Sequence, residues 1–190
     1  MRIAMTTAAG WLATHPRVRL GLNTSVRELT QPDYVDQVLD ALSVSGLDPQ
    51  LLELELTEGD LQEEHRPAID AMRRFAAAGV GFAIDDFGTG YSNLSRLRQL
   101  PFRTLKIDRS LITDIPGDRE DLAIVAAVVT MAGHLGLQTL AEGAERPEQV
   151  EALAELGCEV IQGFALARPM WADDLHTYLA DHSVRGAGLP

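Results

Sequence analysis

From residue 19 onward, the chain alternates between two kinds of apolar pattern. Short runs of strand-forming residues are each followed by a segment whose apolar residues recur at helical spacing. The runs predict six strands, at residues 19–22, 51–56, 80–84, 104–107, 137–141 and 159–161. The helical spacing predicts helices at residues 32–42, 67–78, 94–100, 121–135, 148–156 and 171–180. This strict alternation predicts an α/β fold with a parallel sheet and right-handed crossovers. The near-continuous apolar runs are typical of strands that are buried on both faces.

The two ends of the chain differ from this regular pattern. Residues 1–12 have the apolar spacing of a helix, yet no capping residue stands ahead of them. We therefore expect that a segment upstream of Met1 is missing. Residues 1–182 are predicted to form one domain, and residues 183–190 a frayed tail. No apolar run approaches the ~20 residues that a membrane span needs.

Composition narrows the class of protein. The 190 residues carry a formal net charge of −12, which argues against a binder of nucleic acid polymers, because such proteins are basic. A phosphodiester substrate stays possible if metal ions bridge acidic groups to the phosphate. The single cysteine, Cys158, excludes an intrachain disulfide and fits a reducing cytoplasm. We interpret Cys158 as a small buried hydrophobe.

Each predicted strand ends in a polar residue that could take part in chemistry. In order along the chain, these residues are Asn23, then Glu55 with Glu58, Asp85-Asp86, Lys106 with Asp108, Glu142 with Glu145, and Gln162. The carboxyl ends of the strands of a parallel α/β barrel open on one face, where active sites lie. Asn23 by itself could equally be a helix cap. Six such strand ends together indicate a functional site.

The adjacent carboxylates Asp85 and Asp86 carry the strongest chemical signal. Their mutual repulsion is tolerated where cations lie between them. Together with Glu55 and Asn23 they would form an oxygen-rich cluster suited to two Mg²⁺ or Mn²⁺ ions, which could polarise a phosphodiester and make a hydroxide from water. Lys106 could orient the attacking water or offset charge. Its alternative role is that of a buried ion-pair partner of these acids.

The segment Asp85-Asp86-Phe87-Gly88-Thr89-Gly90-Tyr91-Ser92 closely resembles a motif of the EAL family of cyclic di-GMP phosphodiesterases. Five further segments resemble motifs of the same family. They are Asn23-Thr24-Ser25, Glu55-Leu56-Thr57-Glu58, Lys106-Ile107-Asp108, Ala141-Glu142-Gly143-Ala144-Glu145, and Gln162-Gly163 followed by Arg168-Pro169. Ala144 is a mild departure, since the family has valine there. The resemblance extends from about Trp11 to Trp171.

The resemblance implies a TIM-like (β/α) barrel that hydrolyses cyclic di-GMP to linear pGpG. It implies that Asn23, Glu55 and Asp85 bind a first metal and that Asp86 contributes to a second. Lys106 would hold a catalytic water, and Glu142 would act as a base or a metal ligand, so that Lys106, Glu142 and Asp86 are the candidate catalytic residues. Glu58 would anchor the loop at residues 87–95, which couples metal binding to dimer contacts. Asp108, Glu145 and Gln162 would lie beside the substrate or behind the ligands.

One departure from the family pattern affects activity. The Glu-Ala-Leu strand, whose glutamate is a metal ligand, and a nearby substrate-binding arginine have no counterpart in this sequence. We therefore expect about six of the eight barrel strands and impaired hydrolysis by the chain alone. The alternative function is a non-catalytic module that binds cyclic di-GMP or a protein partner. The resemblance also favours a homodimer, a cytoplasmic location and an attached sensory or diguanylate cyclase (GGDEF) domain.

Overall fold

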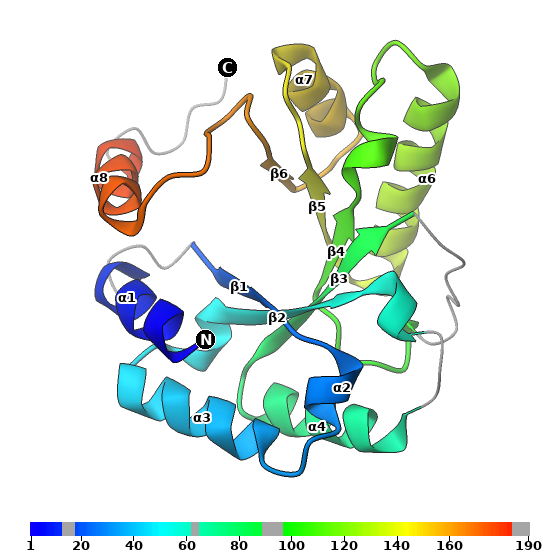
Figure 1. Cartoon of the computed structure of the whole chain (residues 1–190). Helices are drawn as coiled ribbons and strands as arrows, with labels where there is room; N and C mark the ends of the chain where they lie inside the picture. The colour runs from blue at the N-terminus through cyan, green and yellow to red at the C-terminus, as the bar shows by residue number, and fades with distance from the viewer. Residues whose placement is uncertain (13–17, 62–64, 89–96, 184–190) are drawn as a thin grey trace.

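The six predicted strands form a single parallel sheet in the computed structural model, which describes residues 1–12, 18–61, 65–88 and 97–183. The strand order is β1-β2-β3-β4-β5-β6, so each strand lies beside its neighbours in the sequence. The strands are β1 (Leu20–Asn23), β2 (Leu52–Thr57), β3 (Gly81–Phe87), β4 (Thr104–Ile107), β5 (Gln138–Glu142) and β6 (Val160–Gln162). The sheet curves into a half-barrel, and the predicted TIM-like fold with about six strands is confirmed (Figure 1).

Helices follow the strands and cover the outside of the half-barrel, as α3, α4, α6 and α7 show in Figure 1. The α-helices are α1 (Arg2–Leu12), α2 (Val26–Leu29), α3 (Tyr34–Ser45), α4 (Arg66–Ala77), α6 (Arg119–Leu135), α7 (Pro147–Glu155) and α8 (Ala172–Ser183). Short 3₁₀ turns lie at η1 (Pro49–Leu51), η2 (Glu58–Leu61) and η3 (Arg109–Leu111). The sequence pattern did not predict α2 or these turns. Of the helix predicted at residues 94–100, residues 94–96 lie outside the described part of the chain, and of the tail predicted at 183–190 only Ser183 is described, as the last residue of α8.

Local sequence explains where the longer helices start and stop. The carboxylate of Asp118 accepts hydrogen bonds from the N–H groups of Glu120 and Asp121 and so caps α6. Gly46 and Gly136 end α3 and α6 in the left-handed conformation, at φ 71° and 72°. The crossovers between strands are thereby held to fixed lengths, which places the strand ends in register.

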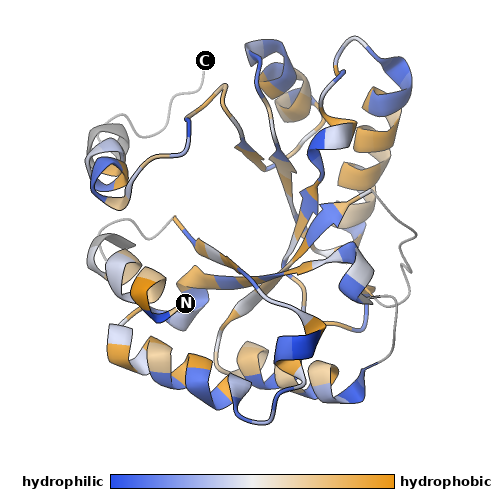
Figure 2. Cartoon of the chain, in the orientation of Figure 1, coloured by the Kyte–Doolittle hydropathy of each residue, from blue (hydrophilic) through white to orange (hydrophobic). Residues whose placement is uncertain are grey.

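The two faces of the sheet differ in chemistry. On β2, Leu52, Leu54 and Leu56 are fully buried toward the helices, whereas the alternating residues Glu53 and Glu55 point to the inside of the half-barrel. Phe75 of α4 packs edge-on against Phe82 of β3 in the apolar layer. Figure 2 shows the strands and their covering helices with this mixture of apolar and polar residues. The prediction of strands buried on both faces is confirmed for Gly81–Ile84 of β3 and for all of β4, whereas β2 also carries the charged residues Glu53 and Glu55 on its inner face.

Within the described residues, β1 and β6 each pair with one strand only. Parallel strands are almost always covered and paired, so these two ends are the open edges of the half-barrel. No helix in the described ranges combines the length and the apolar character that crossing a membrane requires. Cys158 is buried, as predicted from the sequence.

Candidate active site

Three carboxylates converge on the ammonium group of Lys106 at the carboxyl ends of the strands. The Nζ atom lies 2.6 Å from Oε2 of Glu55, 2.9 Å from Oδ1 of Asp85 and 2.8 Å from Oε1 of Glu142. The Lys106 side chain is only 8% exposed. Of the two roles that the sequence allowed, the structure shows the ion-pair role, in which three carboxylates meet the three N–H donors of the ammonium.

The sheet brings these four residues together from four adjacent strands, β2 to β5. Side chains alternate between the faces of a strand, and each of the four is at a position that points inward. Glu55 is opposite Asn23 in the β1–β2 register, which places the Asn23 amide at the neighbouring strand end. The absence of a side chain at Gly21 makes room for the Glu55 carboxylate, because a Cβ there would collide with it.

Charge and burial set the protonation of the cluster. Burial disfavours the charged form of Lys106, but the hydrogen bonds that it donates to Glu142, Glu55 and Asp85 raise its pKa above its ordinary value, so it stays an ammonium. Burial raises the pKa of Glu142 above 4.5; the hydrogen bond from Lys106 opposes this rise, and the charges of Asp85 and Glu55 add to it. A raised pKa suits Glu142 to accept a proton.

Asp86 lies at an irregular end of β3. The register between β3 and β4 shifts between Ile84 and Phe87, and Asp86 adopts φ 55°, a left-handed conformation that is uncommon outside glycine. Its N–H donates to the carboxylate of Asp85 at 3.0 Å. Burial and the charges of Asp85 and Asp108 raise its pKa, and Lys106 acts in the opposite direction. The irregularity lets two consecutive carboxylates lie at the same rim of the site.

Glu58 holds the backbone just after this pair. Its side chain is buried, and Oε2 accepts a hydrogen bond of 3.1 Å from the N–H of Gly88. Its other oxygen, Oε1, is buried and has no hydrogen-bond partner among the residues that the structure describes. This contact lies at the start of the loop at residues 87–95 that Glu58 was predicted to anchor. Residues 89–96 are outside the described part of the chain.

The remaining predicted residues are Asp108, Glu145 and Gln162. Their described hydrogen bonds and ion pairs are with residues other than Lys106. Asp108 accepts from the N–H of Ser110 at 2.9 Å and caps η3. Burial acts to raise the pKa of Asp108, but hydrogen bonds from Ser110 and Arg109 hold it below its ordinary value. Glu145 is paired with Arg109 at 2.9 Å. Gln162 is exposed at the end of β6, and its carbonyl accepts the N–H of Ala144.

Sequence reasoning missed the residues that support the strand ends. Arg109, Arg146 and Gln149 link the segments that follow β4 and β5, and Gly21 makes room for Glu55. Arg146 directly precedes α7, and Gln149 lies in its first turn. Both are polar residues, which the sequence alone would place on the exposed side of the helix. A polar residue at the third position of a helix that starts with proline is the one local signal that could have indicated Gln149.

The donor set fits a hard divalent cation. Mg²⁺ and Mn²⁺ prefer oxygen ligands, and the carboxylates of Glu55 and Asp85 are already gathered around one positive charge. Asn23 and Asp86 offer further oxygens at the adjoining strand ends. Across the described ranges, however, no three acidic, histidine or cysteine side chains are gathered as a metal centre. The Lys106 ammonium is the cation at the point where the carboxylates meet.

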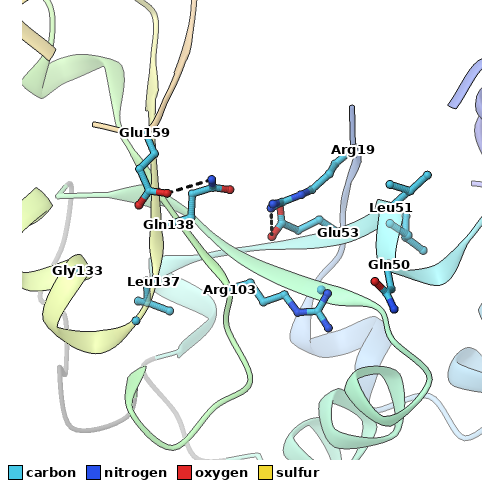
Figure 3. Close-up of a pocket in the computed structure, with 12 residues that line it drawn as sticks. Arg19, Gln50, Leu51, Glu53, Arg103, Gly133, Leu137, Gln138 and Glu159 are labelled. Atoms are coloured by element: carbon cyan, nitrogen blue, oxygen red, sulfur yellow. Dashed lines mark hydrogen bonds and ion pairs between the residues drawn. The ribbon is translucent and has the colours of Figure 1, made fainter. Parts of the chain in front are cut away.

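A hollow lies at the end of the sheet opposite to the carboxylate cluster around Lys106. Its volume is about 630 Å³, and its lining includes Arg19, Glu53, Arg103, Gln138 and Glu159 (Figure 3). These residues stand at or just before the amino ends of the strands, away from Lys106. Glu53 is buried there and accepts a 2.6 Å hydrogen bond from Thr104. The hollow is therefore separate from the carboxylate cluster.

The chain is similar to known proteins in both sequence and structure. A family model described as "EAL domain" matches residues 1–169. The curated relative "Cyclic di-GMP phosphodiesterase NbdA" of Pseudomonas aeruginosa is 42% identical over 168 residues. That match covers 88% of this chain but 22% of the relative, so the chain spans about a fifth of that relative's length.

Two solved structures share the fold. "PaMucR Phosphodiesterase, c-di-GMP complex" has a TM-score of 0.85 at 39% identity, and the match covers 92% of this chain and 71% of that one. "Klebsiella pneumoniae BlrP1 pH 9.0 manganese/cy-diGMP complex" has a TM-score of 0.82 at 32% identity, covering 90% of this chain and 43% of that one. The first contains cyclic di-GMP, and the second contains cyclic di-GMP with manganese.

Proposed function

We propose, on the premise that the chain belongs to the EAL domain family, that it is a cyclic di-GMP phosphodiesterase module that hydrolyses its substrate to linear pGpG. The observation that carries the proposal is the convergence of Glu55, Asp85 and Glu142 on Lys106. The names of the relatives and the cyclic di-GMP in their solved structures support it.

The chain's own residues supply two chemical roles. Lys106, held as an ammonium, donates hydrogen bonds and orients a water molecule at the rim of the cluster. Glu142, whose pKa is raised, accepts a proton from that water as the water oxygen bonds to phosphorus. The P–O3′ bond of the ring breaks, and the 3′ oxygen leaves and takes a proton from solvent, which gives linear pGpG. The 2.8 Å contact between them keeps the donor and the base on the same side of the substrate. Of the other predicted groups, we propose that Asp108, Glu145 and Gln162 lie beside the substrate or behind the ligands.

We infer that the cofactor is divalent, Mg²⁺ or Mn²⁺ in two positions. Asn23, Glu55 and Asp85 would hold one ion, and Asp86 would contribute to the second. When bound, such ions polarise the phosphodiester and lower the pKa of water. The positive charge of ions held by these carboxylates would allow an acidic protein to bind an anionic substrate. Glu58 would keep the following loop in place through Gly88.

Further features of the protein are proposed from the family resemblance. The chain spans a small part of the relatives that it matches, which supports attachment to a sensory or diguanylate cyclase domain. We further propose a homodimer and a cytoplasmic location, where the free thiol of Cys158 stays reduced. Residues 1–182 are proposed as the family domain; Ser183 is the last residue of α8.

A second candidate function rests on one observation. The Lys106 ammonium contacts all three carboxylates and offsets part of their negative charge. Such a site could bind cyclic di-GMP without hydrolysing it. To separate the two functions, the chain is incubated with cyclic di-GMP, with Mn²⁺, with Mg²⁺ or with a chelator. Metal-dependent pGpG supports the phosphodiesterase, and binding without pGpG supports the binding module.

A further inference from the structure

The buried amide of Gln149 uses its full hydrogen-bonding capacity. Gln149 is 1% exposed and occupies the first turn of α7. Its Oε1 accepts from the N–H groups of Glu145 and Arg146, at 2.8 and 2.9 Å. Its Nε2 donates to the carbonyls of Ile112 and Thr113, at 2.7 and 3.1 Å. A glutamine side chain offers two donors and an acceptor oxygen with two lone pairs, so all four are in use.

These four bonds join two separate parts of the chain. Glu145 and Arg146 belong to the β5–α7 loop, whereas Ile112 and Thr113 follow η3 in the β4–α6 connection. The two parts are more than thirty residues apart in the sequence. Gln149 is therefore a bridge between the two segments that leave β4 and β5.

Arg146 and Arg109 strengthen the same bridge. The guanidinium of Arg146 donates to the carbonyls of Thr113 and Ile115, at 3.0 and 2.9 Å. The side chain of Arg109 packs over Gly143, where a Cβ would approach its Cγ to 2.6 Å. Gly143 has φ 80°, which favours glycine, so the loop can turn beneath the arginine.

The bridge lies directly behind the reacting groups. Glu142 is the last residue of β5 and immediately precedes the bridged loop, and Lys106 is two residues before Asp108 at the start of η3. A shift of one segment against the other changes the 2.8 Å contact between Glu142 and Lys106. On the basis of the proposed function, we propose that Gln149 is a positioning residue, which holds the Glu142 carboxylate against the Lys106 ammonium for catalysis.

The effect expected is on the rate rather than on binding. A misplacement of about 1 Å at a reacting group can lower a rate by about a hundredfold. Substrate contacts made by other strands are unaffected, so the KM for cyclic di-GMP should change little. A merely structural role would instead lower the fraction of folded protein and leave the kcat of the folded fraction unchanged.

Two substitutions at Gln149 test the bonds that its Nε2 donates and the bonds that its Oε1 accepts. Gln149→Glu keeps the acceptor for Glu145 and Arg146 but sets a carboxylate oxygen against the carbonyls of Ile112 and Thr113. Gln149→Met removes all four bonds at similar volume and adds no charge. Leu153→Ala is the matched control, because Leu153 is buried on the same helix and contributes to the core only.

The 190-residue chain and its variants are compared for cyclic di-GMP hydrolysis with Mn²⁺, for folded fraction, and by crystal structure. Both Gln149 variants should lower kcat per folded molecule by about tenfold or more, with KM within about threefold, and lengthen the Lys106–Glu142 contact by on the order of 1 Å. Leu153→Ala should lower stability and leave kcat per folded molecule within about twofold.

Two results would overturn the inference. One is a folded Gln149→Glu or Gln149→Met variant whose kcat matches that of the unsubstituted chain. The other is a variant structure in which the Lys106–Glu142 contact stays at 2.8 Å. If the unsubstituted chain itself yields no pGpG, the proposed function fails, and the crystal structures alone decide the role of Gln149. If neither Gln149 variant folds, Arg146→Ala is tested by the same three measurements and must lower kcat.

Discussion

The Glu55 carboxylate of β2 lies over Gly21 of β1, in the space that a side chain at residue 21 would fill. Glu55 reaches Lys106 from this position. The glycine is therefore part of the site although it has no functional group. Glycine is unfavourable inside a strand, and its presence at residue 21 is explained by the close approach of the Glu55 side chain.

Gly21→Ala tests this relationship. The added Cβ should push the Glu55 carboxylate away from Lys106 with little cost to folding, because the far end of a flexible side chain can move. Hydrolysis and Mn²⁺ affinity should each fall by about tenfold, since the second shell of a metal site carries effects of that size. Gly133→Ala in α6 is the control: no atom lies within 4 Å of its new Cβ, and both properties should be unchanged. Unchanged hydrolysis in Gly21→Ala contradicts the role of Gly21.

Lys106→Met should remove both a catalytic group and the charge that joins three acids. Without the ammonium, Glu55, Asp85 and Glu142 repel one another, and losing one partner of a buried ion pair costs about 3 kcal/mol or more. Chemical denaturation without metal should therefore report a lower free energy of unfolding. Added Mn²⁺ should restore part of it, because a divalent cation can take the place of the ammonium charge.

Lys106→Arg is the matched variant for this experiment. It keeps the positive charge, so its free energy of unfolding should lie closer to that of the unsubstituted chain. If Lys106→Met is as stable as the unsubstituted chain in the presence of a chelator, the ion pairs contribute nothing to the fold.

Glu142→Gln should abolish the acidic limb of the pH–rate profile and lower kcat by about a hundredfold. A base acts when deprotonated, so the rate of the unsubstituted chain should rise with pH through the raised pKa of Glu142, above the ordinary value of 4.5. The corresponding contribution to stability has the opposite sign: it is present below the ordinary pKa and lost as pH rises through the raised one. An unchanged acidic limb in Glu142→Gln would assign that limb to another group.

Glu58→Ala should loosen the backbone after Asp86. The N–H of Gly88 loses its acceptor, and because Gly88 itself is exposed, this loss costs about 1 kcal/mol. Thermal unfolding should show this loss, and hydrolysis should fall because Asp85 and Asp86 are no longer held. Glu58→Gln keeps an acceptor oxygen and should be milder in both measurements. Equal effects of the two substitutions would show that the hydrogen bond to Gly88 is not what matters.

Much of the fold follows from local patterns. The strand ends Asn23, Glu55 and Glu142 could be placed because strictly alternating strands and helices allow essentially one arrangement of the sheet. The helix ends at Gly46 and Gly136 follow from the same local chemistry. The meeting of the carboxylates at one rim was therefore predictable.

The supporting contacts were not predictable, for physical reasons. Gln149 is buried only because the carbonyls of Ile112 and Thr113 meet its amide, and no local pattern encodes a contact between segments so far apart in the sequence. The irregular end of β3 at Asp86 depends on its pairing with β4. The charged inner face at Glu53 was missed because the strand was interpreted as a near-continuous apolar run, although Glu53 is itself buried.

The direct test of the central claim is the formation of linear pGpG by the chain from cyclic di-GMP with Mn²⁺ or Mg²⁺, measured beside Asp85→Ala. The account predicts metal-dependent pGpG, formed slowly by this chain alone, and none from Asp85→Ala. Binding of cyclic di-GMP with no pGpG under any metal condition, or the same rate in Asp85→Ala, would contradict it.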